Sequence, residues 1–188
     1  MKKIILASAS PRRSELLKKH GIDFTVLVSD ADETNLGKTP KAIAEQNAYL
    51  KAKAVYDSLK NKENIIVIGA DTVVALDNVI YGKPKDKADA INMLKTLSGR
   101  EHSVITGVAI IKNEAGVCSL LKPSEETLVK FKSLTNAEIE EYVSTDEPYD
   151  KAGSYALQGE AKKFVEYVKG DSENVIGLPA GKIKKYLI

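Results

Sequence analysis

Short apolar runs alternate with amphipathic segments along this chain. Lys3–Ala7 and Ile65–Ala70 are continuous apolar runs, typical of strands buried on both faces. Pro40–Lys60 carries apolar or small residues three to four positions apart, which predicts an amphipathic helix. His102–Lys112 and Val117–Lys132 are rich in Val, Ile, Thr and Phe and predict two long antiparallel strands. Strands interspersed with helices and hairpins indicate an α/β protein with a mixed sheet.

Turn and cap signals delimit the remaining elements. Thr135, with Glu138 three positions later, predicts a capping box at the start of a helix. The other predicted elements are helices Arg12–His20, Lys87–Leu97 and Asn136–Val143, strands Ile22–Val28, Val73–Leu76 and Val79–Tyr81, and a loop over Ser29–Thr39. Neither a repeat nor a linker interrupts this order, so we expect a single domain over residues 1–188.

Composition adds bounds on class and compartment. A chain of 188 residues with 43% apolar and 29% charged residues is an ordinary globular protein with one substantial core. Its longest apolar stretch, Ile65–Leu76, is about half of the ~20 residues that a membrane helix needs, and Asp71 interrupts it. The apolar run near the N-terminus is too short for a signal peptide, and the single cysteine, Cys118, agrees with a reducing compartment. We therefore expect a cytoplasmic protein without a membrane partner.

The sequence Ser-Ala-Ser-Pro-Arg-Arg, residues 8–13, follows the first predicted strand and opens a helix. Unpaired N–H groups and the positive dipole end of a helix favour an anion there. Ser8 and Ser10 add hydroxyl donors, and the forks of Arg12 and Arg13 match phosphate oxygens. The alternative is an ordinary helix cap with exposed arginines, which the electrostatic cost of cations at this helix end argues against. The segment predicts a phosphate-binding loop.

Asp71 is a carboxylate inside an apolar run. An ionised carboxylate removed from water needs compensation, so we expect a metal or a lysine close to it. A perturbed acid in a cleft is also a candidate general base. The alternative is a bend between two strands at Gly69–Asp71, with the carboxylate solvated at the edge of the sheet.

Several other charged residues have more than one interpretation. Asp30, Asp32 and Glu33 form an acidic loop that can ligate a divalent cation, although such loops are often only solvated. Lys53 lies beside the apolar seam of the long predicted helix, and Lys83 lies in a loop that a proline makes rigid. Either ammonium can counter a triphosphate, but spacing alone does not single them out among 28 basic residues.

Some functional classes are excluded. The sequence contains neither Gly-x-Gly-x-x-Gly nor Gly-x4-Gly-Lys-Ser/Thr, so a dinucleotide fold and a P-loop do not fit. No Cys-His metal spacing is present. Nucleic-acid binding through Arg12 and Arg13 would need an extended basic surface, and the net charge of +2 argues against it.

Six short motifs follow one another along the chain. They are Ser-Ala-Ser-Pro-Arg-Arg, Asp32-Glu33, Lys53-Ala54, Gly69-Ala70-Asp71-Thr72, Gly82-Lys83-Pro84 and Asp150-Lys151-Ala152-Gly153. The series continues through Ser98-Gly99-Arg100, Thr106-Gly107-Val108, Tyr155-Ala156-Leu157-Gln158-Gly159 and Asn174-Val175-Ile176-Gly177-Leu178-Pro179. In this order, and nearly end to end, the chain resembles the Maf family.

The resemblance implies a fold and a reaction. Maf proteins are cytoplasmic nucleoside triphosphate pyrophosphatases, commonly homodimers. Their fold is like that of inosine triphosphate pyrophosphatases, with an elongated mixed sheet flanked by helices and two lobes around a cleft. The implied reaction is hydrolysis between the α- and β-phosphates with a divalent metal, Mg²⁺ or Mn²⁺. Positioning and charge neutralisation accelerate this kind of transfer, which cations and a metal supply.

The same resemblance implies roles for individual residues. Asp71 is expected to activate water and, with Glu33, to bind the metal. The residues expected on the phosphates are Ser10, Arg13, Lys53 and Lys83, to which the loop argument adds Ser8. This set predicts a charged site around the triphosphate.

Base preference is also implied. Arg12, Thr72 and Gln158 match the branch of the family that prefers dTTP and UTP, and Lys151 agrees with that branch. A glutamine amide offers a donor and an acceptor, which suits the imide edge of uracil or thymine. The leading hypothesis is therefore a pyrimidine triphosphate pyrophosphatase. The alternative is a non-catalytic nucleotide-binding regulator of septum formation, after which the family is named.

Overall fold

The strands form one open mixed sheet in a computed structural model that describes residues 2–34 and 37–187. They are β1 (Lys3–Leu6), β2 (Thr25–Val26), β3 (Ile65–Leu76), β4 (Val79–Tyr81), β5 (Glu101–Glu114), β6 (Val117–Leu121), β7 (Ser124–Phe131) and β8 (Val165–Lys169). Within the described residues the eight strands follow the order β2-β1-β3-β5-β7-β8, with β4 paired to β3 and β6 to β5. β1 is parallel to β2 and β3, whereas β5 is antiparallel to β3. The predicted α/β class with a mixed sheet is confirmed.

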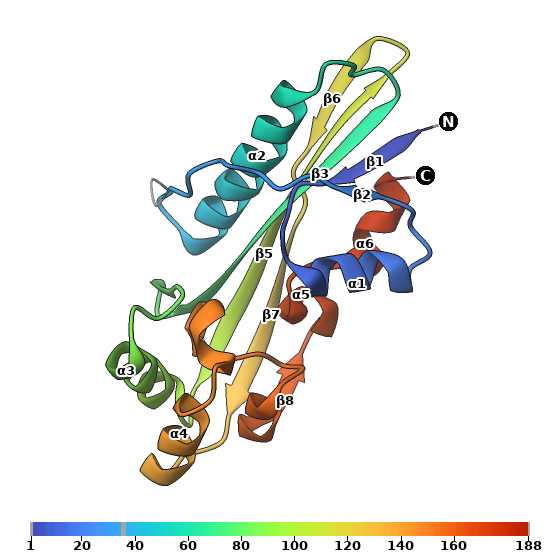
Figure 1. The fold of residues 1–188 in the computed structure, drawn as a ribbon. Helices are drawn as coiled ribbons and strands as arrows, with labels where there is room; N and C mark the ends of the chain where they lie inside the picture. Colours follow the sequence, from blue (N-terminus) through green and yellow to red (C-terminus); the bar gives the residue numbers. More distant parts are fainter. Residues whose placement is uncertain (1, 35–36, 188) are drawn as a thin grey trace.

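Helices cover both faces of this sheet. They are α1 (Pro11–Lys19), α2 (Pro40–Ser58), α3 (Lys87–Leu97), α4 (Asn136–Val143), α5 (Ser172–Ile176) and α6 (Ala180–Ile183), and short 3₁₀ turns lie at Glu147–Asp150, Ala152–Ser154, Glu160–Phe164 and Lys184–Tyr186. Figure 1 shows α2 along one side of the long strands and α1, α5 and α6 on the other, with α3 and α4 at the far end of the molecule. In the part of the chain that the structure describes, no helix is long and apolar enough to cross a membrane.

Two glycines let α2 approach the sheet closely. A Cβ atom at Gly69 would lie 2.2 Å from the backbone oxygen of Ala48, and one at Gly107 would lie 2.4 Å from the carbonyl carbon of Ala44. Because these obstacles are backbone atoms, a side chain at either glycine would push the helix away. The close contact brings the polar residues of α2 down onto β3.

The core consists of separate clusters on the two faces and along the length of the sheet. One cluster packs α1, α6 and Leu178 against Ile66 and Ile68, and another packs α2 against Val67 and Ala109 on the opposite face. The largest gathers α3, α4 and the rings of Phe131, Tyr142, Tyr155 and Phe164 around the far ends of the strands. The sheet is therefore the continuous element that connects both ends of the molecule.

β3 differs from the expected pair of strands. It runs without a break from Ile65 to Leu76, because β5 pairs with it from Ile65↔Asn113 to Ala75↔Ser103. A hairpin turn at Asp77 and Asn78 joins β3 to β4, and both residues have positive φ, as a tight hairpin requires. Asp71 therefore lies in the middle of a strand.

Other boundaries also shift. The strand predicted over Ile22–Val28 is confined to Thr25–Val26, and the strand predicted over Val117–Lys132 is divided into β6 and β7 at Pro123, which has no N–H to donate to a ladder. The capping box at Thr135 is confirmed, since Thr135 and Glu138 exchange side-chain and backbone hydrogen bonds. The loop predicted over Ser29–Thr39 includes residues 35–36, which lie outside the described residues.

Candidate active site

A cavity lies where one edge of β3 has no neighbouring strand. β1 pairs with β3 only as far as Ile68, and β4 begins to pair at Val74. Within the described residues, positions 69–73 of β3 have no strand on this edge, and their side chains alternate between the two faces of the sheet. The cavity of about 740 Å³ that opens here has the size of a small-molecule site. Residues from both faces of the sheet can therefore reach it.

The predicted phosphate-binding loop forms one wall of the cavity and fixes Arg13. The Arg13 Nε atom donates to the Gly177 carbonyl at 2.9 Å, Nη1 to Ser8 Oγ at 3.0 Å and Nη2 to Thr72 Oγ1 at 3.2 Å. Ser8 Oγ also accepts from the Ser10 N–H at 3.2 Å. Burial lowers the pKa of the Arg13 guanidinium, and the charge of Asp71 opposes this shift. All three acceptors are neutral, so the positive charge of Arg13 remains available to an anion.

Asp71 is buried and has two partners on α2. Lys51 Nζ donates to Asp71 Oδ1 at 2.7 Å, and Asn47 Nδ2 donates to Oδ2 at 3.3 Å. The lysine also donates to Glu33 Oε1 at 2.8 Å, and this bond holds the pKa of the Glu33 carboxyl below its usual range. The expectation of a nearby lysine is confirmed. The alternative of a solvated carboxylate is wrong, because Asp71 is only 7% exposed.

The structure brings Lys51, rather than Lys53, into the cavity. Lys53 is exposed and pairs with Asp57 one turn along α2. Two residues on a helix differ by about 200° in direction, so both lysines cannot face the sheet. The expected position of Lys53 is therefore corrected to Lys51. The buried alanines Ala44, Ala48 and Ala52 mark the face of α2 that meets the sheet. Position 51 lies seven residues after Ala44 on this face, so the alanine spacing could have predicted that Lys51 points to the site.

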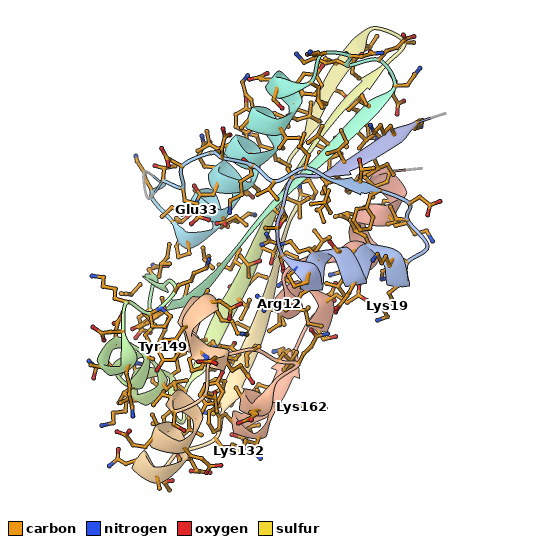
Figure 2. The ribbon with its side chains drawn as sticks, viewed as in Figure 1. Arg12, Lys19, Glu33, Lys132, Tyr149 and Lys162 are labelled. Atoms are coloured by element: carbon orange, nitrogen blue, oxygen red, sulfur yellow. The ribbon has the colours of Figure 1, made fainter. Side chains whose placement is uncertain are left out.

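Most of the other residues that the sequence singled out gather at the cavity, although Asp30 and Asp32 are not among the residues that line it. Its lining includes Ser8, Ser10, Arg12, Arg13, Glu33, Asp71, Thr72, Lys83 and Gln158. Figure 2 shows Arg12 at the beginning of α1 and Glu33 on the segment that precedes α2. Lys83 and Gln158 are exposed, so both side chains have room to meet a ligand.

Arg12 and Thr72 have distinct neighbours. Arg12 Nη1 lies 3.7 Å from Asp150 Oδ2, and Lys151 Nζ donates to the Glu147 carbonyl at 2.7 Å beside it. Thr72 points to the face opposite Asp71, where its Oγ1 lies 2.9 Å from Thr106 Oγ1. Asp150 thus partners Arg12 while neutral oxygens partner Arg13.

Asn47, Lys51 and Asp150 line the cavity although no sequence pattern marked them as site residues, and Gly177 meets Arg13 although its motif implied no role for it. The Arg13 bond to Gly177 joins residues 164 positions apart. No local pattern predicts such a contact.

The cavity has two chemically different halves. We call the charged half the part lined by residues 8–13, Glu33, Lys51, Asp71 and Lys83, and the apolar half the part lined by Val74, Val104, Tyr155 and Leu157. Asp150, Lys151 and Gln158 lie at the rim of the apolar half, on the same segment as Tyr155. This division suits a ligand with an anionic end and a flat, less polar end.

The donor set fits a hard divalent cation. Glu33 Oε1 and Asp71 Oδ1 already share one cation, the Lys51 ammonium, at 2.8 and 2.7 Å. Carboxylate oxygens are the ligands that Mg²⁺ and Mn²⁺ prefer. Among the described residues, no group of three or more His, Cys, Asp or Glu side chains is placed to hold a metal. The two carboxylates would therefore share the ion with oxygens of a ligand.

Comparison with known proteins gives a consistent result. The family model described as Maf-like protein matches residues 3–188. A dTTP/UTP pyrophosphatase of Thermosipho africanus is 50% identical over 182 residues, covering 96% of this chain and 90% of the relative. Proteins of the same name from Clostridium botulinum (strain Okra) and Clostridioides difficile are 46% and 45% identical, covering 100% and 97% of this chain and 97% and 94% of the relatives. The chain belongs to the Maf family.

Proposed function

We propose that this protein hydrolyses dTTP and UTP to the nucleoside monophosphate and pyrophosphate. The observation that carries the proposal is that one cavity holds both the buried carboxylate of Asp71 and the guanidinium of Arg13, whose three acceptors are all neutral. The relatives named dTTP/UTP pyrophosphatase support the choice of substrate. The triphosphate would occupy the charged half and the base the apolar half.

Asp71 is the proposed general base. It accepts a proton from a water molecule whose oxygen bonds to the α-phosphorus, and the bond from this phosphorus to the oxygen bridging the β-phosphate breaks. Pyrophosphate leaves with the bridging oxygen. Lys51 and Asn47 each hold one oxygen of the Asp71 carboxylate and so orient it. Such positioning of the base supplies much of the acceleration in a reaction of this type.

The phosphates bind to cations and hydroxyls of the charged half. Arg13, Lys51 and Lys83 carry the positive charge, and Ser8 and Ser10 add hydroxyl donors. Lys51 replaces Lys53, the residue that the family resemblance implied, in this set. Glu33 and Asp71 would hold Mg²⁺ or Mn²⁺, which when bound neutralises charge on the phosphate oxygens.

The base meets the rim of the apolar half. Gln158 presents an amide to the imide edge of uracil or thymine. Arg12 and Thr72 complete the proposed specificity set, Arg12 through its position beside Asp150 and Thr72 through its bonds to Arg13 and Thr106.

The larger assembly is part of the same proposal. The separate core clusters on either side of the cavity support two lobes around a cleft within one domain. The edge strand β2 and the residues after it expose Val26, Leu27 and Val28, which supports a homodimer, because exposed apolar edges favour association. A lone cysteine agrees with a cytoplasmic location.

Pyrophosphate release from dTTP, UTP, CTP, ATP and GTP with Mg²⁺ or Mn²⁺ tests the proposal. We expect release with dTTP and UTP, and we expect Asp71→Asn to bind nucleotide while losing release by about a thousandfold or more, because an amide cannot accept the proton. Nucleotide binding without release by the wild type would contradict the proposal and favour the non-catalytic regulator of septum formation.

A further inference from the structure

A buried histidine lies beneath the apolar half of the cavity. His102 on β5 is 2% exposed, and its Nε2 lies 2.8 Å from the hydroxyl of Tyr155, which is 5% exposed. The two rings meet edge to face with centroids 5.4 Å apart, and Phe131 packs edge to face against both, at 5.0 Å from His102 and 4.8 Å from Tyr155. The hydrogen bond and the ring packing together fix the depth and the tilt of the Tyr155 ring.

Tyr155 begins the segment that carries Gln158 into the cavity. Residues 155–158 all line the cavity. Directly before them, Gly153 and Ser154 both adopt left-handed backbone conformations, with φ of 66° and 62°. Such a conformation at a non-glycine residue persists only where the surrounding structure holds it. The anchored Tyr155 ring adds to the bond from the Gly153 N–H to the Gly82 carbonyl at 3.0 Å in holding the start of the segment.

The other end of the segment is held by a carboxylate. Glu147 Oε2 accepts from the Glu160 N–H at 2.8 Å, and Oε1 accepts from the Tyr142 hydroxyl at 3.1 Å. Gln158 therefore lies between two anchors, Tyr155 and Glu147. Because only two residues separate Gln158 from Tyr155, a shift of the tyrosine ring displaces the glutamine amide.

His102 itself does not line the cavity; on β5 it precedes by two positions, on the same face, the lining residue Val104. An apolar residue would fill this buried position without the cost of desolvating an imidazole. What the imidazole adds is a directional bond to the Tyr155 hydroxyl. The proposed reaction involves neither group of this bond, so the bond can affect catalysis only by positioning the Tyr155 ring.

We propose that His102 is a positioning residue for pyrimidine recognition. It acts through the Tyr155 hydroxyl to hold the Gln158 amide in position at the base. This inference rests on the proposed function, since it assigns the apolar half to the base. The triphosphate contacts lie on other elements and do not depend on the His102–Tyr155 bond. Loss of the bond should therefore alter KM and base choice more than kcat.

Tyr155→Phe tests the inference, because it removes only the hydroxyl. We expect the KM for UTP to rise up to about fivefold, the loss expected when the Gln158 amide no longer meets the base, and the preference for UTP over CTP to fall by a similar factor, with kcat within about threefold of wild type. UTP and CTP share a ring of one size and differ at the edge that Gln158 would read, so their ratio reports the position of the amide. His102→Gln alone, in a protein that keeps Tyr155, can retain a bond to the tyrosine hydroxyl. This variant should keep most of the preference for UTP.

The double variant His102→Phe/Tyr155→Phe separates positioning from stability. It removes both polar groups together, so its melting temperature should exceed that of Tyr155→Phe, whereas the UTP preference should stay lost. A folded Tyr155→Phe with the wild-type UTP/CTP ratio, or a double variant that regains the ratio, would overturn the inference. If the wild type releases no pyrophosphate from any nucleotide, the proposed function fails first, and this outcome is distinct from an unchanged ratio in an active variant.

Discussion

The charged and apolar halves of the cavity are held in place by different means. In the charged half, ionic and polar side chains fix one another: Lys51 joins Asp71 to Glu33, and Arg13 has three acceptors of its own. In the apolar half, residues 155–158 are held by ring packing, by the buried hydrogen bond between His102 and Tyr155, and by Glu147 at the other end of the segment. Damage to the charged half should therefore lower kcat, and damage to the apolar half should change KM and base choice.

The two lysines of α2 give the largest expected difference. Lys51→Ala removes the cation shared by Asp71 and Glu33, so two carboxylates face each other without compensation. We expect kcat for UTP to fall about a hundredfold or more, the loss typical of removing one preorganised electrostatic partner. Lys53→Ala is the matched control and should stay within about twofold of wild type, because Lys53 is exposed and pairs with the exposed Asp57.

Pyrophosphate release measured at saturating UTP checks this pair. Equal losses in the two variants would contradict the assignment of Lys51 and return Lys53 to the site.

Low pH should destabilise the apolar half through protonation of His102. Burial lowers the pKa of His102 to about 4 from its ordinary value of 6.5. Between these values the unfolded chain binds a proton that the folded chain does not, so the free energy of unfolding falls as pH falls through this window. The contribution of this one group is about 3 kcal/mol over the whole window.

Urea denaturation at pH 7 and at pH 4.5 measures the effect. The carboxylates also titrate near the lower pH, so the comparison is between the wild type and His102→Phe/Tyr155→Phe, which should lose less stability. The same loss in both proteins would show that His102 does not titrate in this way.

Local patterns predicted the charged half better than the apolar half. A carboxylate inside an apolar run needs a cation, and the sequence alone therefore indicated a partner for Asp71. The identity of that partner depended on which face of α2 meets the sheet, and the contacts at Gly69 and Gly107 decide this in favour of Lys51. Loop residues 8–13 were predicted because strand, proline and arginines follow one another directly.

The remaining contacts join residues that are far apart in the sequence, and no local pattern predicts them. Gly177 meets Arg13 because α5 packs beside α1, and His102 meets Tyr155 because a strand and a distant turn share one cluster. The prediction of two strands, Ile65–Ala70 and Val73–Leu76, was wrong for a related reason. Pairing with β5 from Ile65 to Ala75 keeps β3 continuous, and the open edge that places Asp71 at the cavity begins where β1 ends.

Arg13→Lys should produce an intermediate loss in the charged half. An ammonium cannot reach Gly177, Ser8 and Thr72 together with the planar geometry of a guanidinium. We expect kcat/KM for UTP to fall about thirtyfold, which corresponds to roughly 2 kcal/mol. Arg12→Lys is the comparison and should lose less, since Arg12 makes one long contact of 3.7 Å with Asp150. A larger loss for Arg12→Lys would reverse the roles of the two arginines.

The smallest expected effect of a substitution is at Gln158. Here a loss in the apolar half should change KM alone, in contrast to the kcat losses expected in the charged half. The side chain is exposed at the rim, so its truncation leaves no buried group without a partner. Gln158→Ala should raise the KM for UTP about fivefold, close to the roughly 1 kcal/mol of one neutral hydrogen bond, and leave kcat unchanged. Steady-state kinetics with UTP and CTP resolve this change. If kcat falls instead while KM stays constant, Gln158 acts on the triphosphate, and the assignment of the apolar half to the base is wrong.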